Sequence, residues 1–282
     1  MMAKLIDGRA LARQIRQELK EDILTLRNQH NLVPGLTVIL VGDDPASHVY
    51  VRNKERACSE VGIHSNVIRM NAEVTEKELL DTIEGLNNDD KVHGILVQLP
   101  LPDHINEKAV INAIKPAKDV DGFHPVNSGM LMTGQAVLEP CTPKGIIRLI
   151  EETGCIIAGK HAVVIGRSNI VGKPVAMMLL QKHATVTIAH SRTQDLATVA
   201  ASADILVVAI GKPQLIDDSY IKKDAIVIDV GTTRVNGALM GDVKFDKATE
   251  KAAYITPVPG GVGPMTITML LENTLIAARN SI

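Results

Sequence analysis

Short apolar runs alternate along the chain with longer segments in which apolar residues recur at helical spacing. In the first half, strands are expected at 36–42, 65–70 and 94–100, and helices near 8–29, 45–61, 75–87 and 106–115. In the second half, strands are expected at 161–166, 184–190, 203–210 and 225–231, and a last helix follows Pro264 and runs to about Arg279. Such alternation is typical of βαβ units, so an α/β protein with parallel sheets is predicted.

The pattern breaks once, between the two halves. The stretch 115–145 is rich in Gly, Pro and Asp, which is typical of a linker and of a loop that lines a cleft. We therefore expect two lobes. The first is an α/β domain at 1–140, with the C-terminal helix 265–282 packing back on it, and the second is a Rossmann-type nucleotide-binding domain at 141–264. A chain of 282 residues is long enough for two modest domains.

Composition narrows the classes of function. A net charge of −2, with no basic stripe and few aromatic residues, argues against nucleic-acid binding. No apolar run approaches the length of a membrane span, and the first residues pass into an amphipathic helix without the core of a signal peptide. Three cysteines without C-x-x-C spacing favour a reducing cytoplasm over a disulfide framework or zinc site. The nine scattered histidines give no reason to expect a metal.

The expected helix 45–61 carries an unusual set of side chains on one face. Asp44 can cap its N-terminus, and the proline that follows suits a first position that needs no N–H donor. At 3.6 residues per turn, Ser47, Tyr50 and Lys54 share one side of the helix. A hydroxyl, a ring and an amine make a poor core face but a good site, because the ring can stack on a flat ligand and the amine can exchange a proton.

A simpler interpretation of Tyr50 and Lys54 is a surface pair in which the lysine stem lies along the ring, and spacing alone favours it. Two observations favour the site instead. The chain has only 3 Tyr, 2 Phe and no Trp, so a ring in a polar helix calls for a reason. The helix also follows the apolar strand 36–41, and open α/β sheets bind ligands at the carboxyl ends of their strands.

A strand, a glycine turn and a helix follow one another at 161–180. Gly166 ends the strand. The turn departs from the usual G-x-G-x-x-G pattern, because Ser168 takes the place of the second glycine and the third, Gly172, is displaced by one residue. The strand before, the helix after and a second strand ending near Ser191 make a βαβ unit of suitable length, in which the helix N-terminus would face a phosphate. A plain connecting turn is the alternative, and the βα units that follow disfavour it.

The end of the second strand of this unit distinguishes NAD from NADP. An acidic residue there would bond the ribose 2′-hydroxyl, but this chain has no acid before Asp195. Ser191 and Arg192 offer a hydroxyl and a guanidinium instead, and Arg167 lies in the first turn. These groups suit a 2′-phosphate, so NADP is the expected cofactor. Arg192 could also be a solvated surface charge.

Three further segments are candidates for the cleft. Gln98 interrupts an apolar strand near its carboxyl end, and a buried amide there must belong either to a structural network or to a site. Asp119 and Asp121 lie in the cleft loop, although close carboxylates are often turn formers. The loop 256–266 is rich in Gly and Pro and enters the last helix, so it either binds a ligand through its N–H groups or is a rigid turn.

Seven motifs then occur in the order and spacing of a known family, over nearly the whole chain. The chain resembles the bifunctional methylenetetrahydrofolate dehydrogenase/cyclohydrolases of the bacterial FolD type, with these motifs: PASHVYVRNK, GILVQLPLP, PAKDVDGFHPVNSG, PCTPKG, GRSNIVGKP, IDVG and TPVPGGVGPMT. The resemblance implies that NADP⁺ takes a hydride from 5,10-methylenetetrahydrofolate and that water converts the methenyl product to 10-formyltetrahydrofolate. It also implies the two lobes and a homodimer formed through the nucleotide lobes.

The resemblance places functional residues on this chain one by one. It implies that Lys54 is the catalytic lysine, that Tyr50 stacks on the folate, that Gln98 positions the lysine and that Asp121 binds the pterin. Further folate contacts are implied at Val97, Leu99, Pro259, Gly260, Gly261, Val262 and Gly263. Nucleotide contacts are implied at Gly166, Arg167, Ser168, Ser191 and Thr232, beside the candidate Arg192 argued above. At Thr232 the chain departs from the family, because Thr-Thr-Arg follows IDVG where many relatives have an aliphatic residue and then Asn.

The chemistry agrees with these residues. Loss of hydride from an N–CH₂–N carbon needs positioning rather than a base, whereas hydrolysis of the methenyl cation needs proton transfer. A lysine beside that cation should have a lowered pKa, because like charges oppose each other. Three alternatives compete: a dehydrogenase without the hydrolase step, a non-catalytic NADP-binding regulator, and a two-lobed dehydrogenase for a shikimate-like or amino acid substrate. Lys54, Tyr50, Gln98 and the glycine-rich loop 259–263 favour folate.

Overall fold

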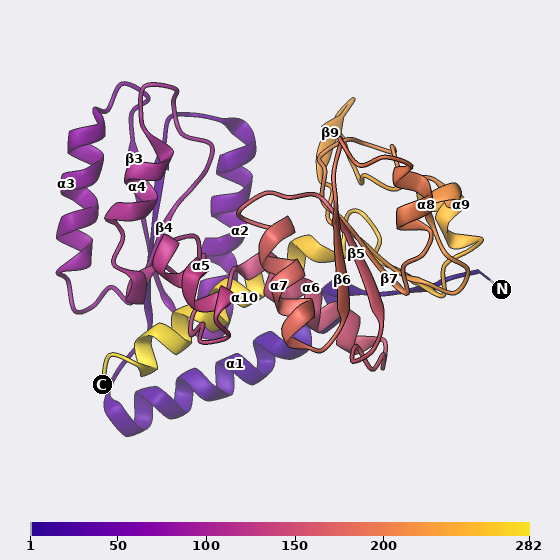
Figure 1. Cartoon of the computed structure of the whole chain (residues 1–282). Helices are drawn as coiled ribbons and strands as arrows, with labels where there is room; N and C mark the ends of the chain where they lie inside the picture. Colours follow the sequence, from indigo (N-terminus) through magenta and orange to yellow (C-terminus); the bar gives the residue numbers. More distant parts are fainter. Residues whose placement is uncertain (1) are drawn as a thin grey trace. The chain divides into compact units, whose positions relative to one another are not determined.

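The computed structural model describes residues 2–282, which form two compact units (Figure 1). The six-stranded unit contains the N-terminal stretch up to Arg13 together with Thr142–Thr266. The three-stranded unit contains Gln14–Cys141 and Ile267–Ile282. Both units have parallel sheets with helices in the crossovers, so the expected α/β fold class is confirmed.

The sheet of the three-stranded unit is built around β2 (Gly35–Val41), which is buried along its whole length. β3 (His64–Met70) and β4 (Gly94–Val97) pair with it in parallel on either side, giving the order β3-β2-β4. The continuous apolar run of β2 follows from this central place, because a central parallel strand is covered on both faces. The strand expected at 94–100 ends at Val97, since proline at positions 100 and 102 cannot donate to a ladder.

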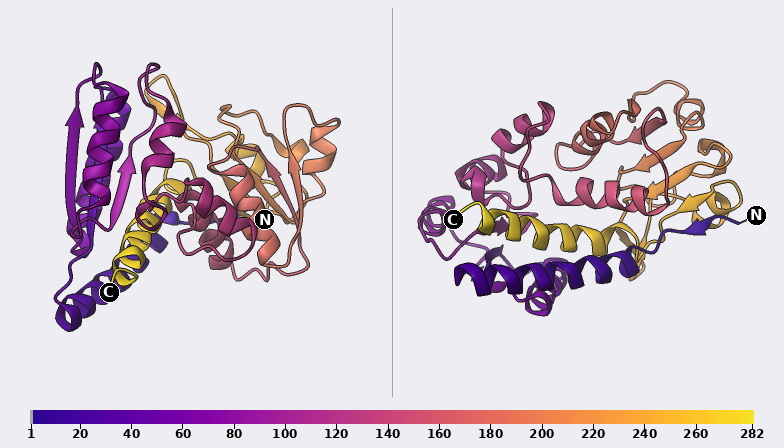
Figure 2. Two further views of the ribbon diagram at one scale, coloured as in Figure 1. Left: turned by 60° about the vertical axis from the view of Figure 1, so that its left-hand side comes forward. Right: turned by 90° about the horizontal axis from the view of Figure 1, so that it is seen from below.

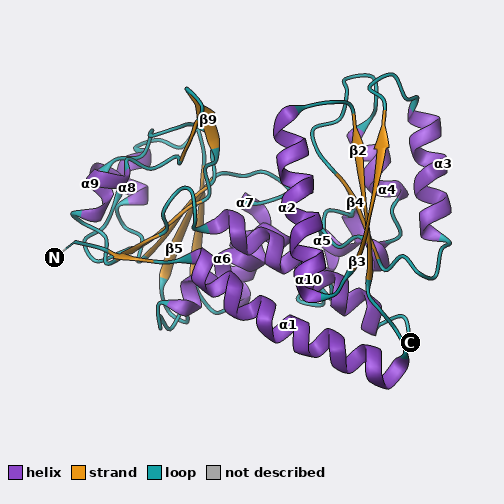
Figure 3. Ribbon diagram, turned by 180° about the vertical axis from the view of Figure 1, so that it is seen from behind, coloured by secondary structure: helices purple, strands orange, loops and turns teal. Residues whose placement is uncertain are grey.

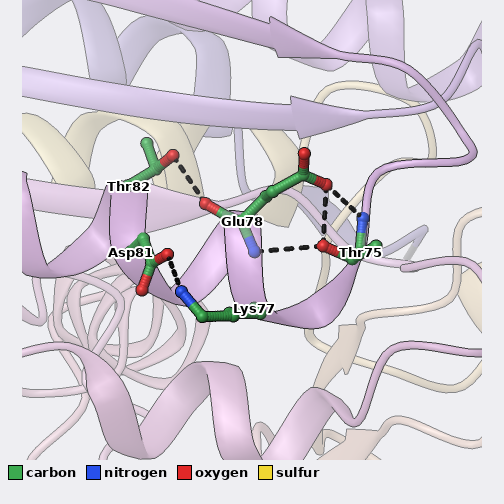
Figure 4. A network of polar contacts seen from close by, with 5 residues as sticks. All are labelled: Thr75, Lys77, Glu78, Asp81 and Thr82. Atoms are coloured by element: carbon green, nitrogen blue, oxygen red, sulfur yellow. Dashed lines mark hydrogen bonds and ion pairs between the residues drawn. The ribbon is translucent and has the colours of Figure 1, made fainter.

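Helices cover both faces of this sheet, as the view in Figure 3 shows. α2 (Pro45–Val61) packs on β2 and β3, while α3 (Glu76–Asn87) and α4 (Glu107–Ala113) share a core cluster with Ile39 and Ile95. α3 begins with a reciprocal cap in which the Thr75 hydroxyl accepts the Glu78 N–H and the Glu78 carboxylate accepts the Thr75 N–H (Figure 4).

Two long helices complete the three-stranded unit and lie side by side in it (Figure 2). They are α1 (Gly8–His30) and α10 (Val262–Arg279). Within this unit Arg16 donates to Thr268 Oγ1 at 3.0 Å, and Arg279 pairs with Asp22 at 3.1 Å. α10 begins at Val262 rather than after Pro264, because a proline in the first turn of a helix needs no N–H partner.

The expectation of a long irregular loop at 115–145 was wrong in part. It contains the 3₁₀ helix η1 (Pro116–Lys118), α5 (Pro125–Met132) and the start of α6 (Cys141–Glu152). α5 is capped by His124, whose ring Nδ1 accepts the Val126 N–H at 3.1 Å. These helices are short and rich in Gly and Pro, so their composition resembles that of a loop.

The sheet of the six-stranded unit has the order β1-β11-β8-β7-β5-β6, with every pairing parallel. Its strands are β1 (Lys4–Leu5), β5 (His161–Ile165), β6 (Thr185–Ala189), β7 (Ile205–Val208), β8 (Ile226–Asp229) and β11 (Tyr254–Ile255). The other elements are α7 (Gly172–Gln181), α8 (Leu196–Ala200), η2 (Asp218–Tyr220), α9 (Phe245–Thr249) and the hairpin β9 (Thr233–Val235) and β10 (Ala238–Met240). The N-terminal residues, expected in the first lobe, join this sheet because β1 pairs with β11.

Candidate active site

In the three-stranded unit, α2 starts directly after β2 and its first turn is held by one carboxylate. Asp44 Oδ2 accepts the Ser47 N–H at 2.7 Å and the Ser47 hydroxyl at 2.8 Å. Ser47 is therefore 3% exposed and its hydroxyl serves the helix cap. The face expected to hold Ser47, Tyr50 and Lys54 thus begins with a structural residue, and its two later members remain candidates for chemistry.

Lys54 contacts the residue that follows β4. Its Nζ donates to Gln98 Oε1 at 3.1 Å, and Gln98 Nε2 donates to the Leu99 carbonyl at 2.8 Å. The Gln98 N–H still bonds to Ile39 in β2 at 2.9 Å, which fixes the position of the backbone. The contact arises because β2 and β4 are neighbours and their carboxyl ends meet at one edge, where open α/β sheets bind ligands.

The structure separates the two aspartates of the cleft loop. Asp119 is 2% exposed, and its Oδ2 accepts the His124 N–H and the Asn127 amide, each at 2.8 Å. It is a turn former. Asp121 is half-buried and lines a small apolar pocket that also includes Val97, Leu99 and Phe123. Asp119 also lines this pocket, so the otherwise apolar wall carries two carboxylates, of which Asp119 is held by the donors of its own turn.

Burial shifts both titratable groups of this site toward their neutral forms. It lowers the pKa of the Lys54 ammonium, and the charge of Asp121 opposes this effect. Burial likewise raises the pKa of the Asp121 carboxyl, against the effect of the Lys54 charge. The buried thiol of Cys141 touches the same site, since it hydrogen bonds to Asp121 and donates to the Val120 carbonyl at 3.1 Å. An amine with a lowered pKa can act as an acid or a base near neutrality.

Tyr50 lies one helical turn before Lys54 and is 40% exposed. Its ring is available to a ligand, and its stacking role stays a prediction. Within residues 2–282, no group of three or more His, Cys, Asp and Glu side chains is arranged to hold a metal ion. No helix in the same range combines the length and the apolar character that a bilayer crossing requires.

A second pocket lies in the six-stranded unit, where β5 has β6 on one side and β7 on the other. This reversal of strand order is the point at which such sheets bind nucleotides. Residues after β5, β7 and β8 line the pocket: Ser168, Ile170, Val171, Ala209, Gly211, Val230, Gly231, Thr232, Thr233 and Asp242. Ser168 and Thr232, both expected to contact the nucleotide, therefore line the same pocket.

The glycines of the turn after β5 are required by close backbone contacts. Gly166 has φ +133°, and a Cβ there would lie 2.3 Å from the Ala209 carbonyl oxygen. A Cβ on Gly172 would lie 2.4 Å from the Gly166 carbonyl oxygen. The Ser168 hydroxyl accepts the N–H groups of Val171 and Gly172, each at 3.2 Å, so part of the helix N-terminus is already capped by the serine.

The residues expected at the 2′-phosphate are exposed at the same edge of the sheet. Arg167 follows β5, and Ser191 and Arg192 follow β6, its neighbour. The Arg192 N–H donates to His190 Nδ1 at 3.2 Å, which holds the backbone of this turn and leaves the guanidinium exposed. The structure thus places the three groups on adjacent strands, and their contact with a phosphate stays a prediction.

The loop expected to border the folate belongs to the six-stranded unit. Gly260 has φ +117°, and its carbonyl accepts the Arg9 N–H at 3.1 Å. A Cβ on Gly8 would lie 1.9 Å from the Gly261 carbonyl oxygen, so the loop packs closely against the start of α1. Gly260 and Gly261 therefore have a structural role here, and the contact of Pro259, Gly260, Gly261, Val262 and Gly263 with folate stays a prediction.

Sequence patterns missed Asp242, which lines the nucleotide pocket, and Asp229, which accepts the N–H groups of the pocket residues Gly231 and Asp242. Asp229 ends β8, and Asp242 follows the β9–β10 hairpin. The signal in the sequence was Asp229 at the end of the apolar strand IVID, because burying a carboxylate costs free energy unless it is hydrogen bonded.

Comparison with known proteins matches both halves of the chain to one family. Residues 6–121 match the catalytic-domain model of tetrahydrofolate dehydrogenase/cyclohydrolase, and residues 140–282 match its NAD(P)-binding-domain model. The chain is 58% identical to the bifunctional protein FolD of Brevibacillus brevis over 99% of this chain and 98% of that protein.

Two solved structures are similar over almost their full length. The bifunctional FolD enzyme of Campylobacter jejuni aligns with a TM-score of 0.97 at 49% identity, covering 99% of this chain and 100% of that one. The methylenetetrahydrofolate dehydrogenase-cyclohydrolase of Trypanosoma brucei, complexed with NADP and an inhibitor, aligns with a TM-score of 0.96 at 43% identity, covering 100% and 99%. With both of its units matched, the chain belongs to the tetrahydrofolate dehydrogenase/cyclohydrolase family.

Proposed function

We propose that the chain carries out both reactions of its family in one-carbon folate metabolism. It oxidises 5,10-methylenetetrahydrofolate with NADP⁺ and hydrolyses the 5,10-methenyl product to 10-formyltetrahydrofolate. The observation that carries the proposal is the Lys54 amine, bonded to Gln98 and electrostatically coupled to Asp121, with a pKa lowered by burial. Family membership supports the same assignment.

Lys54 serves the hydrolytic step. Water adds to the methenyl carbon and loses one proton. The resulting hydroxyl loses the second proton as the carbonyl forms and the carbon–N5 bond breaks, N5 gains one proton, and one proton is released to solvent overall. A neutral Lys54 amine accepts the proton from water and returns it to N5, so one group acts as base and then as acid. Gln98 orients the amine through the 3.1 Å hydrogen bond. NADP⁺, when bound, supplies the hydride acceptor for the first step.

Replacing Lys54 by Gln tests this role. Methenyltetrahydrofolate decay, followed by absorbance without NADP⁺, should slow by about 10²–10⁴-fold, the usual contribution of a positioned acid or base. The folate KM should change far less, and methenyl product should accumulate in the coupled assay. Lys77→Gln is the matched control, because Lys77 lies exposed on α3. Hydrolysis at the wild-type rate in Lys54→Gln would exclude Lys54 as the acid or base.

Tyr50 and Asp121 hold the pterin in this proposal. Asp121 accepts its N–H groups, and a hydrogen bond to a charged acceptor contributes about 1.5–3 kcal/mol. Tyr50 stacks on the ring, which contributes about 0.5–1.5 kcal/mol beyond area burial. Asp121→Asn and Tyr50→Ala should therefore raise the folate KM, and Asp121→Asn should also lower turnover. Unchanged folate kinetics in both variants would remove the two residues from the site.

The nucleotide pocket holds NADP. Ser168 and Thr232 line it, and we assign the 2′-phosphate to Ser191 and Arg192, with Arg167 as the second arginine. Charge-assisted bonds to that phosphate are absent for NAD, and each 1.4 kcal/mol lost weakens binding about tenfold. Arg192→Ala should lower kcat/KM for NADP⁺ and leave NAD⁺ use unchanged. Arg167→Ala should have the same effect to a slightly smaller degree, and Lys247→Ala, at an exposed lysine, is the control. Equal efficiency of the wild type with both cofactors would overturn the preference.

A homodimer formed through the six-stranded units is also part of the proposal. β6 is the edge strand of its sheet, and Ile188 on it is 39% exposed, which suits pairing with a second copy. Sedimentation velocity should give twice the monomer mass at micromolar concentration. Ile188→Lys should shift the distribution toward monomer, because it puts a charge on the pairing strand. A monomeric wild type would contradict this assignment.

A reducing cytoplasmic environment is the expected location. Cys58 and Cys141 are buried thiols that form no disulfide, and Cys155 is half-buried. Burial raises the pKa of Cys58 to about 11, so its thiol is unreactive near neutrality. Fractionation of source cells should recover the protein with the cytoplasmic markers, and recovery elsewhere would contradict the expectation.

A further inference from the structure

Two buried carboxylates belong to no role assigned above: one lines the nucleotide pocket, and the other is hydrogen bonded to residues that line it. Asp229 is 4% exposed and ends β8, and Asp242 is 0% exposed and follows the β9–β10 hairpin. Asp242 is itself one of the residues that line the pocket. Buried aspartates are uncommon unless they are paired or fully hydrogen bonded, so their partners need to be identified.

Asp229 binds the two ends of the hairpin to β8. Its Oδ1 accepts the N–H groups of Gly231 and Asp242, each at 2.9 Å, and its Oδ2 accepts the Val243 N–H at 3.0 Å. Gly231 opens the excursion that contains the hairpin, and Asp242 and Val243 close it. One carboxylate therefore sets where the hairpin leaves the sheet and where it returns.

Asp242 extends this anchor to the next strand. Its Oδ2 accepts the N–H groups of Ile210 at 2.8 Å and Gly211 at 2.9 Å, which follow β7. The pair thus ties together the segments after β7 and β8 and the return of the hairpin. Each of these segments supplies pocket-lining residues: Gly211, Gly231, Thr232, Thr233 and Asp242.

Two glycines are fitted closely around the carboxylates. A Cβ on Gly241 would lie 1.9 Å from Asp229 Oδ2, and a Cβ on Gly231 would lie 2.5 Å from Asp242 Oδ1. Real Cβ atoms do not approach so closely, so both positions require glycine. The arrangement of carboxylates and backbone therefore depends on glycine at both positions.

The fourth oxygen of the pair, Asp242 Oδ1, is buried and has no hydrogen-bond partner. A buried carboxylate oxygen without a donor costs free energy. Burial also raises the pKa of Asp229 to about 6, and the negative charge of Asp242 adds to that rise. A chain that needed only to cap two backbone turns could do so with neutral side chains, and costly buried charge is characteristic of functional sites.

We propose that Asp242, anchored through its N–H by Asp229, is a positioning residue for the dinucleotide. It fixes the pocket wall formed by the segments after β7 and β8 and so sets the affinity for NADP⁺, without contacting the reacting atoms. This inference rests on the proposed function of the pocket. It implies that loss of the Asp242 carboxylate weakens NADP⁺ binding while the hydrolytic step, assigned to Lys54 in the other unit, continues unchanged.

A graded series of variants tests the proposal on the full chain. Asp242→Asn keeps the shape and a neutral acceptor for Ile210 and Gly211, whereas Asp242→Ala removes the acceptor. Because charge-assisted hydrogen bonds are about twice as strong as neutral ones, the Asp242→Asn variant should bind NADP⁺ about three- to fivefold more weakly than wild type. The Asp242→Ala variant should bind it at least about tenfold more weakly. Calorimetry measures the NADP⁺ Kd, and dehydrogenase kinetics should show a raised KM with kcat largely retained.

The second activity of the enzyme supplies the internal control. Cyclohydrolase kcat/KM, measured without NADP⁺, should stay within about twofold of wild type in every folded variant. Asp217→Ala, at a partly buried acid that does not line the pocket, should change neither readout. An unchanged Kd in Asp242→Ala, or cyclohydrolase activity that falls together with NADP⁺ affinity, would overturn the positioning role. Should Asp242→Ala not fold, Asp242→Asn decides alone, and a Kd within about twofold of wild type overturns it. A wild type that neither binds NADP⁺ nor hydrolyses methenyltetrahydrofolate would instead refute the proposed function itself.

Discussion

Titration of Asp229 should make the stability of the six-stranded unit fall as pH rises through the mildly acidic range. Burial raises the pKa of Asp229 from 3.8 to about 6, and its three backbone N–H bonds offset only part of that rise. A rise of about two pKa units corresponds to about 3 kcal/mol of folding free energy that depends on the protonation of Asp229. Because the folded state holds the proton more tightly than the unfolded state, this stabilisation is fully present below about pH 4 and is lost as pH rises through about 6.

Urea unfolding followed by circular dichroism from about pH 4 to about pH 7 measures this effect, with Asp229→Asn as the variant that cannot titrate. The free energy of unfolding of the wild type minus that of Asp229→Asn should fall by about 2–3 kcal/mol across this range. Asp217→Asn is a control of opposite sign, because hydrogen bonds from Ser219 and Lys244 lower the pKa of Asp217. A difference between wild type and Asp229→Asn that stays constant with pH would refute the linkage.

Three further variants probe other parts of the molecule. Asp121→Asn removes the charge that raises the pKa of Lys54, so the rising limb of the cyclohydrolase pH profile should move to lower pH, and an unmoved limb would contradict the coupling. Gly172→Ala places a Cβ against the Gly166 carbonyl and should abolish NADP⁺ binding in calorimetry while methenyltetrahydrofolate hydrolysis persists. Asn273→Ala removes the amide that donates to the Val120 and Glu139 carbonyls and should lower the free energy of unfolding by about 2 kcal/mol in urea titrations.

The strand pattern was predictable where strands are central, because a central parallel strand needs a continuous apolar run. β2 and β8 are such strands, and each is buried along its length. β1 and β11 have two residues each, and β1 pairs with a strand at the opposite end of the sequence, so no local pattern marks them. α6 was missed behind its Pro and Gly, although Ile146, Leu149 and Ile150 give it helical spacing and are buried.

The sequence predicted which residues belong to the candidate site, but not which of them contact one another. Lys54 and Gln98 were expected near strand ends, and their hydrogen bond depends on the order β3-β2-β4, which no local pattern specifies. Asp119 and Asp121 lie in one turn, so local pattern did not distinguish them and only the resemblance singled out Asp121. The packing shows that the Asp119 carboxylate accepts donors of its own turn, although both residues line the pocket.

The two reactions make different physical demands, and each unit has groups that suit one of them. Hydride transfer needs a fixed cofactor, and the six-stranded unit offers close glycine turns and carboxylates that bind backbone N–H groups. Hydrolysis needs a group that both accepts and donates a proton, and burial lowers the pKa of Lys54 before any cationic substrate arrives. The charge of Asp121 opposes burial and raises the pKa of Lys54, so the carboxylate proposed to receive the pterin also tunes the lysine.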